Sequence, residues 1–169
     1  LQALGAESVV LDLLDAEAVG RAVSAAAPDV VVHEATALAP AAGSLRKFDE
    51  AFAVTNRLRT EGTDNLLAAA RAVGARKFVA QSYAGWPYAR EGAAVKDEEA
   101  ALDENPVDNA KKTIAAIRYL EERVVAADGI VLRYGGFYGP GTSLAAGAAE
   151  MVEAVRKRMF PVVGSGAGM

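Results

Sequence analysis

The sequence predicts an α/β fold with a doubly wound parallel sheet, and two observations support this prediction. Short runs of β-branched and other apolar residues alternate along the chain with longer, alanine-rich stretches, which is the order of strands and helices in such a fold. The apolar runs also lack a polar residue at every second position, as in Val30-Val31-Val32. That pattern indicates strands buried on both faces, as parallel strands usually are.

The first predicted strand and helix lie within the first 28 residues. Residues 8–12 form an apolar run that ends in the carboxylate of Asp12, which is typical of a buried strand. Asp15 is a suitable N-cap for a helix over residues 16–26, and Pro28 closes that helix.

The rest of the chain repeats this alternation. Gly74 stands where a C-cap belongs, and Gly129 is expected to end the helix before the last apolar run. A break is expected near Gly62, inside a long helical stretch. The predicted elements after Pro28 are, in order, a strand at residues 29–33, a loop at 39–44, a helical region at 45–73, a strand at 77–82, an irregular segment at 83–106, a helix at 110–127, a strand at 130–134, a glycine-rich loop at 135–141 and a helix at 144–157.

Composition restricts the chemistry that the chain can perform. The 169 residues are about the length of one domain. The net charge is -4 and the basic residues are scattered, which argues against nucleic acid as a partner. No run is apolar and long enough to span a membrane. The absence of cysteine excludes disulfides and thiolate nucleophiles, and the single histidine, His33, argues against a histidine-based metal centre.

Five segments resemble, in the same order, motifs of the extended short-chain dehydrogenase/reductases, the family of nucleotide-sugar epimerases and dehydratases. No single match is specific, but five in the right order are. The segments are Leu11 to Asp15, similar to the family's Asp-Leu-x-Asp turn; His33 to Thr36, similar to His-x-Ala-Ala; Asn56 with Gly62 to Leu67, similar to Asn-x-x-Gly-Thr-x-Asn-Leu-Leu with extra residues between; Phe78 to Ser82, similar to the strand before the catalytic serine; and Leu132 to Gly141, similar to Leu-Arg-Pro-Gly-x-x-Tyr-Gly-Pro-Gly.

The resemblance implies a Rossmann-type domain that binds NAD or NADP. Residues 1–169 would be a partial domain, because the family's first strand, its Gly-x-x-Gly-x-x-Gly phosphate loop and the residue that selects NAD or NADP have no counterpart in this sequence. Residues 142–169 would begin the substrate-binding part. We also expect the protein to be cytoplasmic, to act on a small molecule and to have no membrane partner. Two copies would pair as a homodimer through their two long helices.

The resemblance puts cofactor-binding residues at the carboxyl ends of the strands, where Rossmann-type domains bind their ligands. Asp12 and the backbone of Leu13 would contact the adenine; Asp12 also suits a turn cap, and the two roles are compatible. Ala35 and Thr36 would lie near the nicotinamide ribose. The remaining implied contacts are Tyr134, Gly135, Gly136 and Phe137 beside the nicotinamide, and Trp86 and Tyr138 in the substrate pocket.

Candidate catalytic hydroxyl groups are expected at the end of the third predicted strand. The family has two hydroxyl residues there, and they correspond to Ser82 and Tyr83. A tyrosine departs from the pattern, and an aromatic lid is the alternative role for Tyr83. His33 is expected to be a neutral, hydrogen-bonded structural residue. Tyr134 and Tyr138 are candidates for a replacement acid.

The family's catalytic pair, Tyr-x-x-x-Lys on the helix before the last strand, is missing. Tyr119 and Arg123 have a similar spacing, but the helical period puts them opposite the buried stripe. When Glu121-Glu122 is aligned with the family's glutamate pair, Thr113 takes the tyrosine position and Ile117 the lysine position. Thr113 then joins the two strand-end residues as a candidate catalytic residue. A proton donor with a suitably shifted pKa accelerates a reaction by about a hundred- to ten-thousand-fold. Without the pair, this acceleration would be lost, or another residue would have to supply it.

Two functions follow from the resemblance. The first is an NAD(P)-dependent oxidoreductase, epimerase or dehydratase that acts on a hydroxyl or carbonyl substrate, with nucleotide sugars among the candidates. The second is a non-catalytic NAD(P)-binding sensor or regulatory protein of the same fold, which the missing tyrosine and lysine favour. Residues 1–169 alone would bind a dinucleotide poorly without the phosphate loop.

Overall fold

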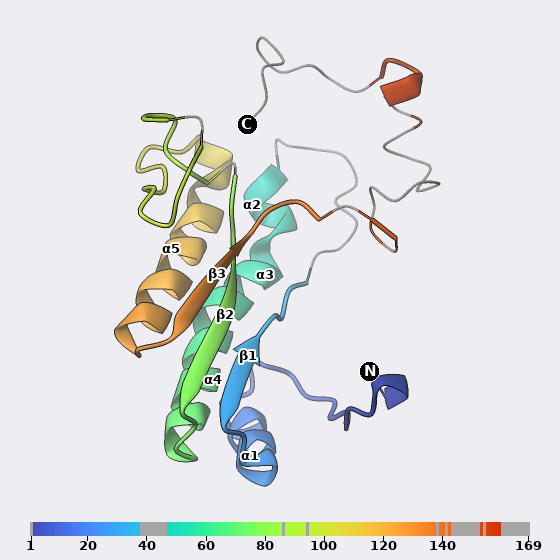
Figure 1. Ribbon diagram of the computed structural model, residues 1–169, viewed down its shortest axis with the longest axis vertical. Coiled ribbons are helices and arrows are strands. Elements are labelled where there is room, and N and C mark those ends of the chain that lie inside the picture. The colour runs from blue at the N-terminus through green and yellow to red at the C-terminus, as the bar shows by residue number, and fades with distance from the viewer. Residues whose placement is uncertain are drawn as a thin grey trace.

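The computed structural model describes residues 2–37, 47–85, 87–93, 95–137, 139–140, 142, 153 and 155–159. Its centre is a sheet of three parallel strands, which lie side by side in chain order (Figure 1). The strands are β1 (Val30–His33), β2 (Lys77–Tyr83) and β3 (Ile130–Tyr134). The predicted α/β fold with parallel strands is therefore confirmed, and these strands lie where the sequence predicts them.

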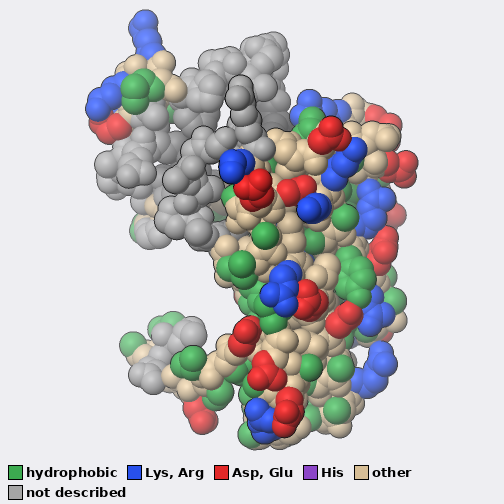
Figure 2. All heavy atoms as spheres, turned by 180° about the vertical axis from the view of Figure 1, so that it is seen from behind, with side chains coloured by type: hydrophobic (Ala, Val, Ile, Leu, Met, Phe, Trp, Pro, Cys, Tyr) green, Lys and Arg blue, Asp and Glu red, His purple; other side chains and the backbone are tan. Residues whose placement is uncertain are grey.

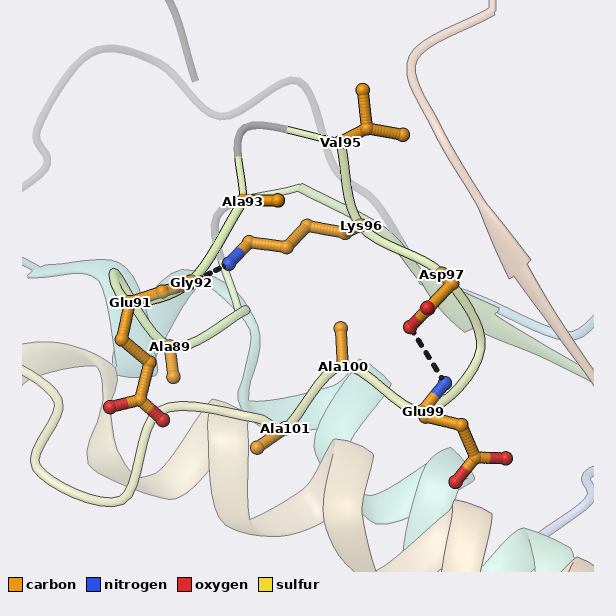
Figure 3. Close-up of a pocket in the computed structure, with 10 residues that line it drawn as sticks. All are labelled: Ala89, Glu91, Gly92, Ala93, Val95, Lys96, Asp97, Glu99, Ala100 and Ala101. Atoms are coloured by element: carbon orange, nitrogen blue, oxygen red, sulfur yellow. Dashed lines mark hydrogen bonds between the residues drawn. The ribbon is translucent and has the colours of Figure 1, made fainter.

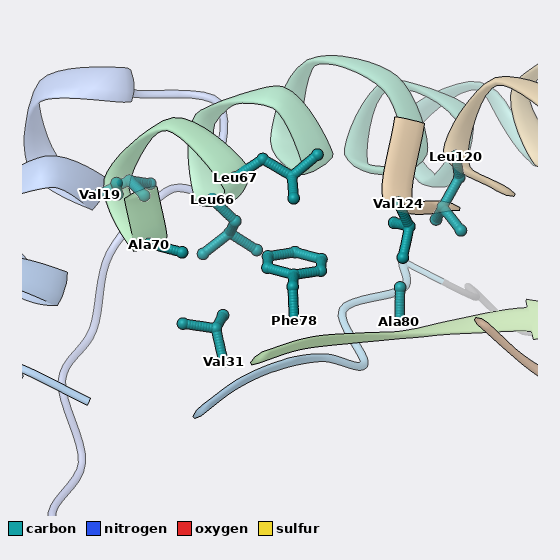
Figure 4. Packing of buried hydrophobic residues seen from close by; sticks show 10 residues of the cluster. Val19, Val31, Leu66, Leu67, Ala70, Phe78, Ala80, Leu120 and Val124 are labelled. Carbon is teal, nitrogen blue, oxygen red and sulfur yellow. The ribbon is translucent and has the colours of Figure 1, made fainter. Parts of the chain in front are cut away.

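Helices α1, α4 and α5 lie against one face of this sheet, so that their apolar side chains meet those of the strands (Figure 4). From behind, the helices carry charged side chains of both signs (Figure 2). The helical elements are η1 (Gln2–Leu4), α1 (Ala16–Ala26), α2 (Phe48–Ala51), α3 (Ala53–Arg57), the π-helical turn η3 (Leu58–Gly62), α4 (Thr63–Ala72), η4 (Asp108–Ala110) and α5 (Lys111–Ala126). None of the described helices is long and apolar enough to cross a membrane.

Phe78 stands at the centre of the hydrophobic core. Its ring is 5% exposed and lies between the sheet and two helices, with Leu66 on α4 and Val124 on α5 among its neighbours in the cluster (Figure 4). Burying a side chain of this size contributes about 2–3 kcal/mol to stability. The core therefore fixes α4 and α5 on the sheet, and these helices carry the residues that reach the strand ends.

The opposite face of the sheet carries no helix within the described residues. Val30, Val32 and Ile130 point to it and are 44%, 57% and 46% exposed. A doubly wound sheet has helices on both faces, so the described part shows one of the two predicted helical layers.

The predicted strand at residues 8–12 is wrong. Val9 and Val10 are 64% and 101% exposed, and no described strand pairs with this segment. Strands are held by the ladder of a neighbouring strand, and an apolar sequence cannot replace that ladder. Only the turn at the end of the segment forms, because Asp12 Oδ1 accepts a hydrogen bond from the Leu14 amide over 2.9 Å.

The helix ends follow the sequence signals closely. Asp15 caps α1 by accepting hydrogen bonds from the amides of Glu17 and Ala18. Gly74 adopts a φ of 73° just after α4, a left-handed conformation that favours glycine. The break predicted near Gly62 is a π-helical turn that ends at this residue, so the helix continues through it. The predicted helix at residues 144–157 lies mostly outside the described residues.

Gly129 has a packing role that the sequence does not reveal. A Cβ at this position would lie 2.7 Å from Val124 Cγ1 and 2.8 Å from the Phe78 carbonyl oxygen. The chain therefore passes from α5 into β3 in direct contact with the core, and any larger residue would push the two elements apart.

Candidate functional site

The three strands are parallel, so their carboxyl ends point to the same edge of the sheet, although β1 stops opposite Ala80, three residues before β2 ends. His33, Tyr83 and Tyr134 are their last residues. The residues that the sequence predicts near the nicotinamide follow directly, with Ala35 after β1 and Gly135 after β3. The carboxyl edge of a parallel sheet is where open α/β folds bind their ligands, so the candidate site lies here.

Tyr134 and Glu34 are joined across this edge. The Tyr134 hydroxyl donates a hydrogen bond to Glu34 Oε1 over 3.1 Å. Burial raises the pKa of Tyr134, and the hydrogen bond to Glu34 raises it further, so the phenol stays protonated. Glu34 did not emerge from the sequence as a site residue; the signal that marks it is an acidic side chain directly after an apolar strand.

The aromatic side chains at this edge form a group. Tyr83 and Tyr134 are neighbours in the β2–β3 ladder and point to the same, helix-free face. The ring of Phe137 meets the ring of Tyr134 edge-on, with centroids 5.2 Å apart. Trp86 and Tyr138, which the sequence predicts as substrate contacts, lie outside the described residues.

The residues present fit the nicotinamide half of a dinucleotide. Gly135 and Gly136 are exposed, and a Cβ at either would meet no atom within 4 Å, so a ligand can approach their backbone closely. Ala35 is small and partly buried, and Thr36 is exposed.

The diphosphate half has no equivalent site in the described part of the chain. Diphosphates bind free amides at helix N-termini. Asp15 already caps α1, and Asp49 occupies the amides of Lys112 and Thr113 at the start of α5.

The predicted adenine contacts lie in the turn before α1. Asp12 is exposed and uses one carboxylate oxygen to cap that turn. The Leu13 carbonyl accepts a hydrogen bond from Asn65 Nδ2 over 2.9 Å, which ties the turn to α4. The turn is therefore held in place although the strand before it does not form.

His33 is structural, as the sequence predicts. It is 3% exposed, and Nε2 lies 3.2 Å from the Leu58 carbonyl oxygen in the π-helical turn. Its other ring nitrogen accepts a hydrogen bond from the Ala35 amide. Burial lowers the pKa of His33, so the ring is neutral at pH 7 and fixes the end of β1 against the helix.

Ser82 points away from Tyr83, toward the helices. Its hydroxyl donates to Glu121 Oε1 over 2.5 Å, and the serine is 2% exposed. Glu121 is also bound by Arg133 through two hydrogen bonds, of 3.0 and 2.8 Å. The structure thus places the two predicted strand-end residues on opposite faces of the sheet, and only Tyr83 lies on the face of Tyr134.

Arg133 also holds the loop between β2 and α5. Its Nη1 donates to the carbonyl oxygens of Glu98 and Ala100, and its guanidinium lies 5.4 Å from the centre of the Tyr88 ring. The loop folds back on itself through a bridge between Tyr88 and Leu102. It encloses a hollow of about 350 Å³, where the Lys96 ammonium binds the Glu91 carbonyl oxygen (Figure 3).

Thr113 is buried, and its hydroxyl both donates and accepts a hydrogen bond within the protein. Its hydroxyl donates to Asp49 Oδ1 over 2.6 Å and accepts from Asn56 Nδ2 over 3.0 Å, and the residue is 0% exposed. Ile117, one turn later, is 1% exposed. The predicted buried stripe of α5 is therefore confirmed, and it offers neither a phenol nor a cation.

The Tyr119 and Arg123 pair lies away from the buried stripe of α5, as the sequence predicts, and contacts another helix, which the sequence did not predict. The Tyr119 hydroxyl donates to Asp64 Oδ2 over 2.5 Å, and Arg123 Nε donates to Asp64 Oδ1 over 2.8 Å. Asp64 lies on α4, so this cluster links the outer sides of two helices. The pair has the spacing of a catalytic pair but not its position.

Comparison with known proteins gives three kinds of match. The sequence profile described as "NAD dependent epimerase/dehydratase family" matches residues 2–168. A curated relative, the "3-diazoavenalumate denitrifying reductase" of a Streptomyces species, is 47% identical over 166 residues, which are 95% of this chain and 52% of the relative. The chain therefore spans about half the length of that relative.

Solved structures match over a similar share of their length. The NAD complex of the UDP-glucose 4-epimerase from Thermus thermophilus is 28% identical with a TM-score of 0.57, over 82% of this chain and 43% of that one. The dTDP-4-dehydrorhamnose reductase of Clostridium acetobutylicum is 22% identical with a TM-score of 0.61, over 88% of this chain and 47% of that one, and supports the fold alone.

Proposed function

Because this chain belongs to the NAD-dependent epimerase/dehydratase family, we propose that it is part of a nicotinamide-dependent reductase that acts on a diazo-bearing aromatic substrate. The observation that carries the proposal is the interior position of Thr113 and Ile117, which we propose stand at the family's tyrosine and lysine positions. The name of the Streptomyces relative supports it, since that protein is a reductase of a diazo compound.

The absence of the family's tyrosine and lysine limits the reactions that this site can catalyse, because the pair transfers a proton to or from the substrate. Reducing a carbonyl or oxidising a hydroxyl transfers a proton along with the hydride, and a tuned acid or base accelerates that step by about a hundred- to ten-thousand-fold. Thr113 cannot serve, because its proton is donated to Asp49 within the protein interior. A substrate whose reduction requires no proton from the enzyme suits this site better.

An aryl diazonium is such a substrate. When bound, a reduced nicotinamide supplies one hydride, which replaces the diazonium group on the ring carbon, so that N2 leaves with the bonding electrons of its C–N bond and the oxidised cofactor remains. The leaving group departs as a neutral gas, and no protein group has to protonate it.

The residues of this chain would bind and orient the reactants. Ala35, Gly135 and Gly136 leave room for the nicotinamide ribose and ring at the carboxyl edge. Tyr83 and Tyr134 would form an aromatic wall for the substrate ring. Asp12, Leu13, Thr36 and Phe137 remain proposed cofactor contacts, and Trp86 and Tyr138 remain proposed substrate contacts.

The intact protein would have a doubly wound sheet, with a second helical layer on the helix-free face. Either NAD or NADP would serve as its cofactor, and we propose a cytoplasmic homodimer. A non-catalytic NAD(P) sensor is the second candidate, which the same interior position of Thr113 favours. Epimerisation or dehydration of nucleotide sugars is less well supported, because both need proton transfer at carbon or oxygen.

Turnover of the intact protein distinguishes these functions. The protein is titrated with NADH and NADPH, and oxidation of the reduced cofactor and release of N2 are then measured with an aryl diazonium, a UDP-sugar and a simple ketone. We expect the diazonium to be turned over, with one N2 released for each cofactor molecule oxidised, and the UDP-sugar and the ketone not to react. Cofactor binding without turnover of any substrate would support the sensor, and turnover of the UDP-sugar alone would contradict the proposal.

A further inference from the structure

Glu34 and Tyr134 connect the two outer strands across the end of the middle one. Glu34 directly follows β1 and Tyr134 ends β3, and their side chains meet over 3.1 Å. Since β2 lies between these strands, the hydrogen bond passes the last residues of β2, between Ala80, which pairs with His33, and Tyr83, which pairs with Tyr134. A carboxylate is thereby fixed at the edge where the reactants meet.

The tyrosine that binds this carboxylate belongs to a group of aromatic side chains. Tyr83 and Tyr134 are ladder neighbours on one face, and the Phe137 ring packs edge-on against Tyr134 while remaining 62% exposed. Aromatic faces attract organic cations, and the attraction grows when the cation is partly removed from water. A carboxylate beside aromatic rings is thus the composition of a site for an organic cation.

The charges of the strands support the same conclusion. Of the described side chains on residues 30–34, 77–83 and 130–134, Glu34 is the one charged group at the carboxyl edge of the helix-free face. Lys77 starts β2 at the other end and is bound to Asp128, and Arg133 points to the helices and is bound to Glu121. None of these described strand side chains neutralises Glu34 from this face.

We propose that Glu34, Tyr83 and Tyr134 bind the positively charged group of the substrate, an aryl cation such as a diazonium. This inference rests on the proposed function and adds the charge that the site selects. The Tyr134 phenol holds the Glu34 carboxylate in position. Because the product of the reaction is uncharged, it loses the attraction to Glu34, which favours its release.

Binding of a stable aryl cation tests the proposal without turnover. Hydroxyphenyl-trimethylammonium and tert-butylphenol have nearly the same shape and differ in charge. Their Kd values are measured by calorimetry on the intact protein with reduced cofactor bound. We expect the cation to bind about fivefold more tightly than the neutral phenol, a preference of the size of a weak cation–π contact combined with a surface ion pair, and the preference should shrink at high salt.

Two variants identify the group responsible. Glu34→Gln should reduce the preference for the cation to the part that the aromatic rings contribute, and leave the Kd of tert-butylphenol unchanged. Glu122→Gln, which changes the same side chain at an exposed position of α5, should keep the preference.

Three results would overturn the proposal. The first is that the wild-type protein has no preference for the cation, and the second is that Glu34→Gln weakens both probes equally. The third is that Glu34→Gln changes only the ratio of NAD+ to NADH affinity, since Glu34 would then face the oxidised nicotinamide ring. Failure of the proposed function is a separate result, namely no N2 release from a diazonium by the wild-type protein.

Discussion

Glu121 is the one acidic side chain among the buried residues of the described part of the chain. It is 8% exposed, accepts the Ser82 hydroxyl and is bound by Arg133 through both of its oxygens. A carboxylate removed from water is stable only while its partners remain. The Arg133 side chain therefore neutralises Glu121 and also anchors the loop that follows β2.

Removing Arg133 should destabilise the protein strongly. Arg133→Met leaves Glu121 buried without its cation, and we expect a loss of about 3 kcal/mol in the free energy of unfolding. Arg123→Met is the matched control, because its pair with Asp64 is half exposed and should contribute less than about 1 kcal/mol. Urea unfolding measures both. Equal losses in the two variants would contradict the role assigned to Glu121.

His33 should make stability depend on pH. Burial holds its folded-state pKa below the ordinary value of 6.5, while the Leu58 carbonyl and Glu34 favour the charged ring and Arg59 opposes it. As the pH falls below 6.5, the unfolded chain therefore binds a proton that the folded protein does not, and stability falls until the folded-state pKa is passed.

The variant His33→Gln should remove this dependence. His33 is the single histidine of the chain, so thermal unfolding between about pH 5 and 7 reports chiefly on it. We expect a flatter profile in the variant, with the wild-type protein losing stability toward the acid end. A profile of the same slope in both proteins would show that another group is responsible.

At the scale of elements, the first amides of α5 are capped by a carboxylate from α2. Asp49 accepts the amides of Lys112 and Thr113 and the Thr113 hydroxyl. The first amides of a helix have no partner within the helix, and the helix dipole favours a negative charge there. Asp49 thus serves as a cap from a distant part of the sequence.

Asp49→Ala should weaken this start of α5. We expect a loss of about 1–2 kcal/mol in the free energy of unfolding and faster hydrogen exchange at the amides of Lys112 and Thr113. Glu50→Gln is the control, because Glu50 pairs with Lys47 at the surface and should have little effect. Unchanged exchange at these amides would contradict the capping role.

The helical region over residues 48–72 contains a π-helical turn at the place where the sequence predicted a break. It brings the Leu58 carbonyl to His33. It also buries Arg59, whose Nη1 has no partner in the described part of the chain and whose pKa burial lowers to about 10. Such turns are frequent at functional sites, and this one adjoins the candidate site through β1.

Local sequence signals predicted the elements that depend on neighbouring residues. Asp15, Gly74 and the period of α5 acted as expected because caps and helix faces are set within a few residues. Residues 8–12 failed because a strand depends on a partner elsewhere. The roles of Ser82 and Glu34 also escaped prediction, since each depends on a side chain from a distant segment, Glu121 for one and Tyr134 for the other.

At the scale of the whole molecule, the described sheet has one covered and one open face. Apolar patches on a protein surface commonly mark contacts with other protein segments, and β1 also presents an unpaired edge to solvent among the described strands. Residues 1–169 should therefore associate with further copies of themselves when they are produced alone.

Val32→Lys should reduce that association. Val32 is 57% exposed on the open face of the edge strand β1, so a lysine there interrupts the apolar patch and repels a second copy. We expect less binding of an apolar dye and less light scattering. Val125→Lys is the control, because Val125 is similarly accessible but lies on α5. A similar reduction in both variants would show that net charge, rather than this face, controls association.

The order of the strands also bears on how the protein emerges from the ribosome. Each strand pairs with the one synthesised before it, and the intervening helix returns to the same face. A nascent chain can therefore add β2 to β1 and then β3 to β2 without waiting for a later segment to be inserted between them. Synthesis is slow compared with the closing of such short loops, so we expect the candidate site to assemble vectorially, with its edge complete as soon as Tyr134 and Phe137 leave the exit tunnel.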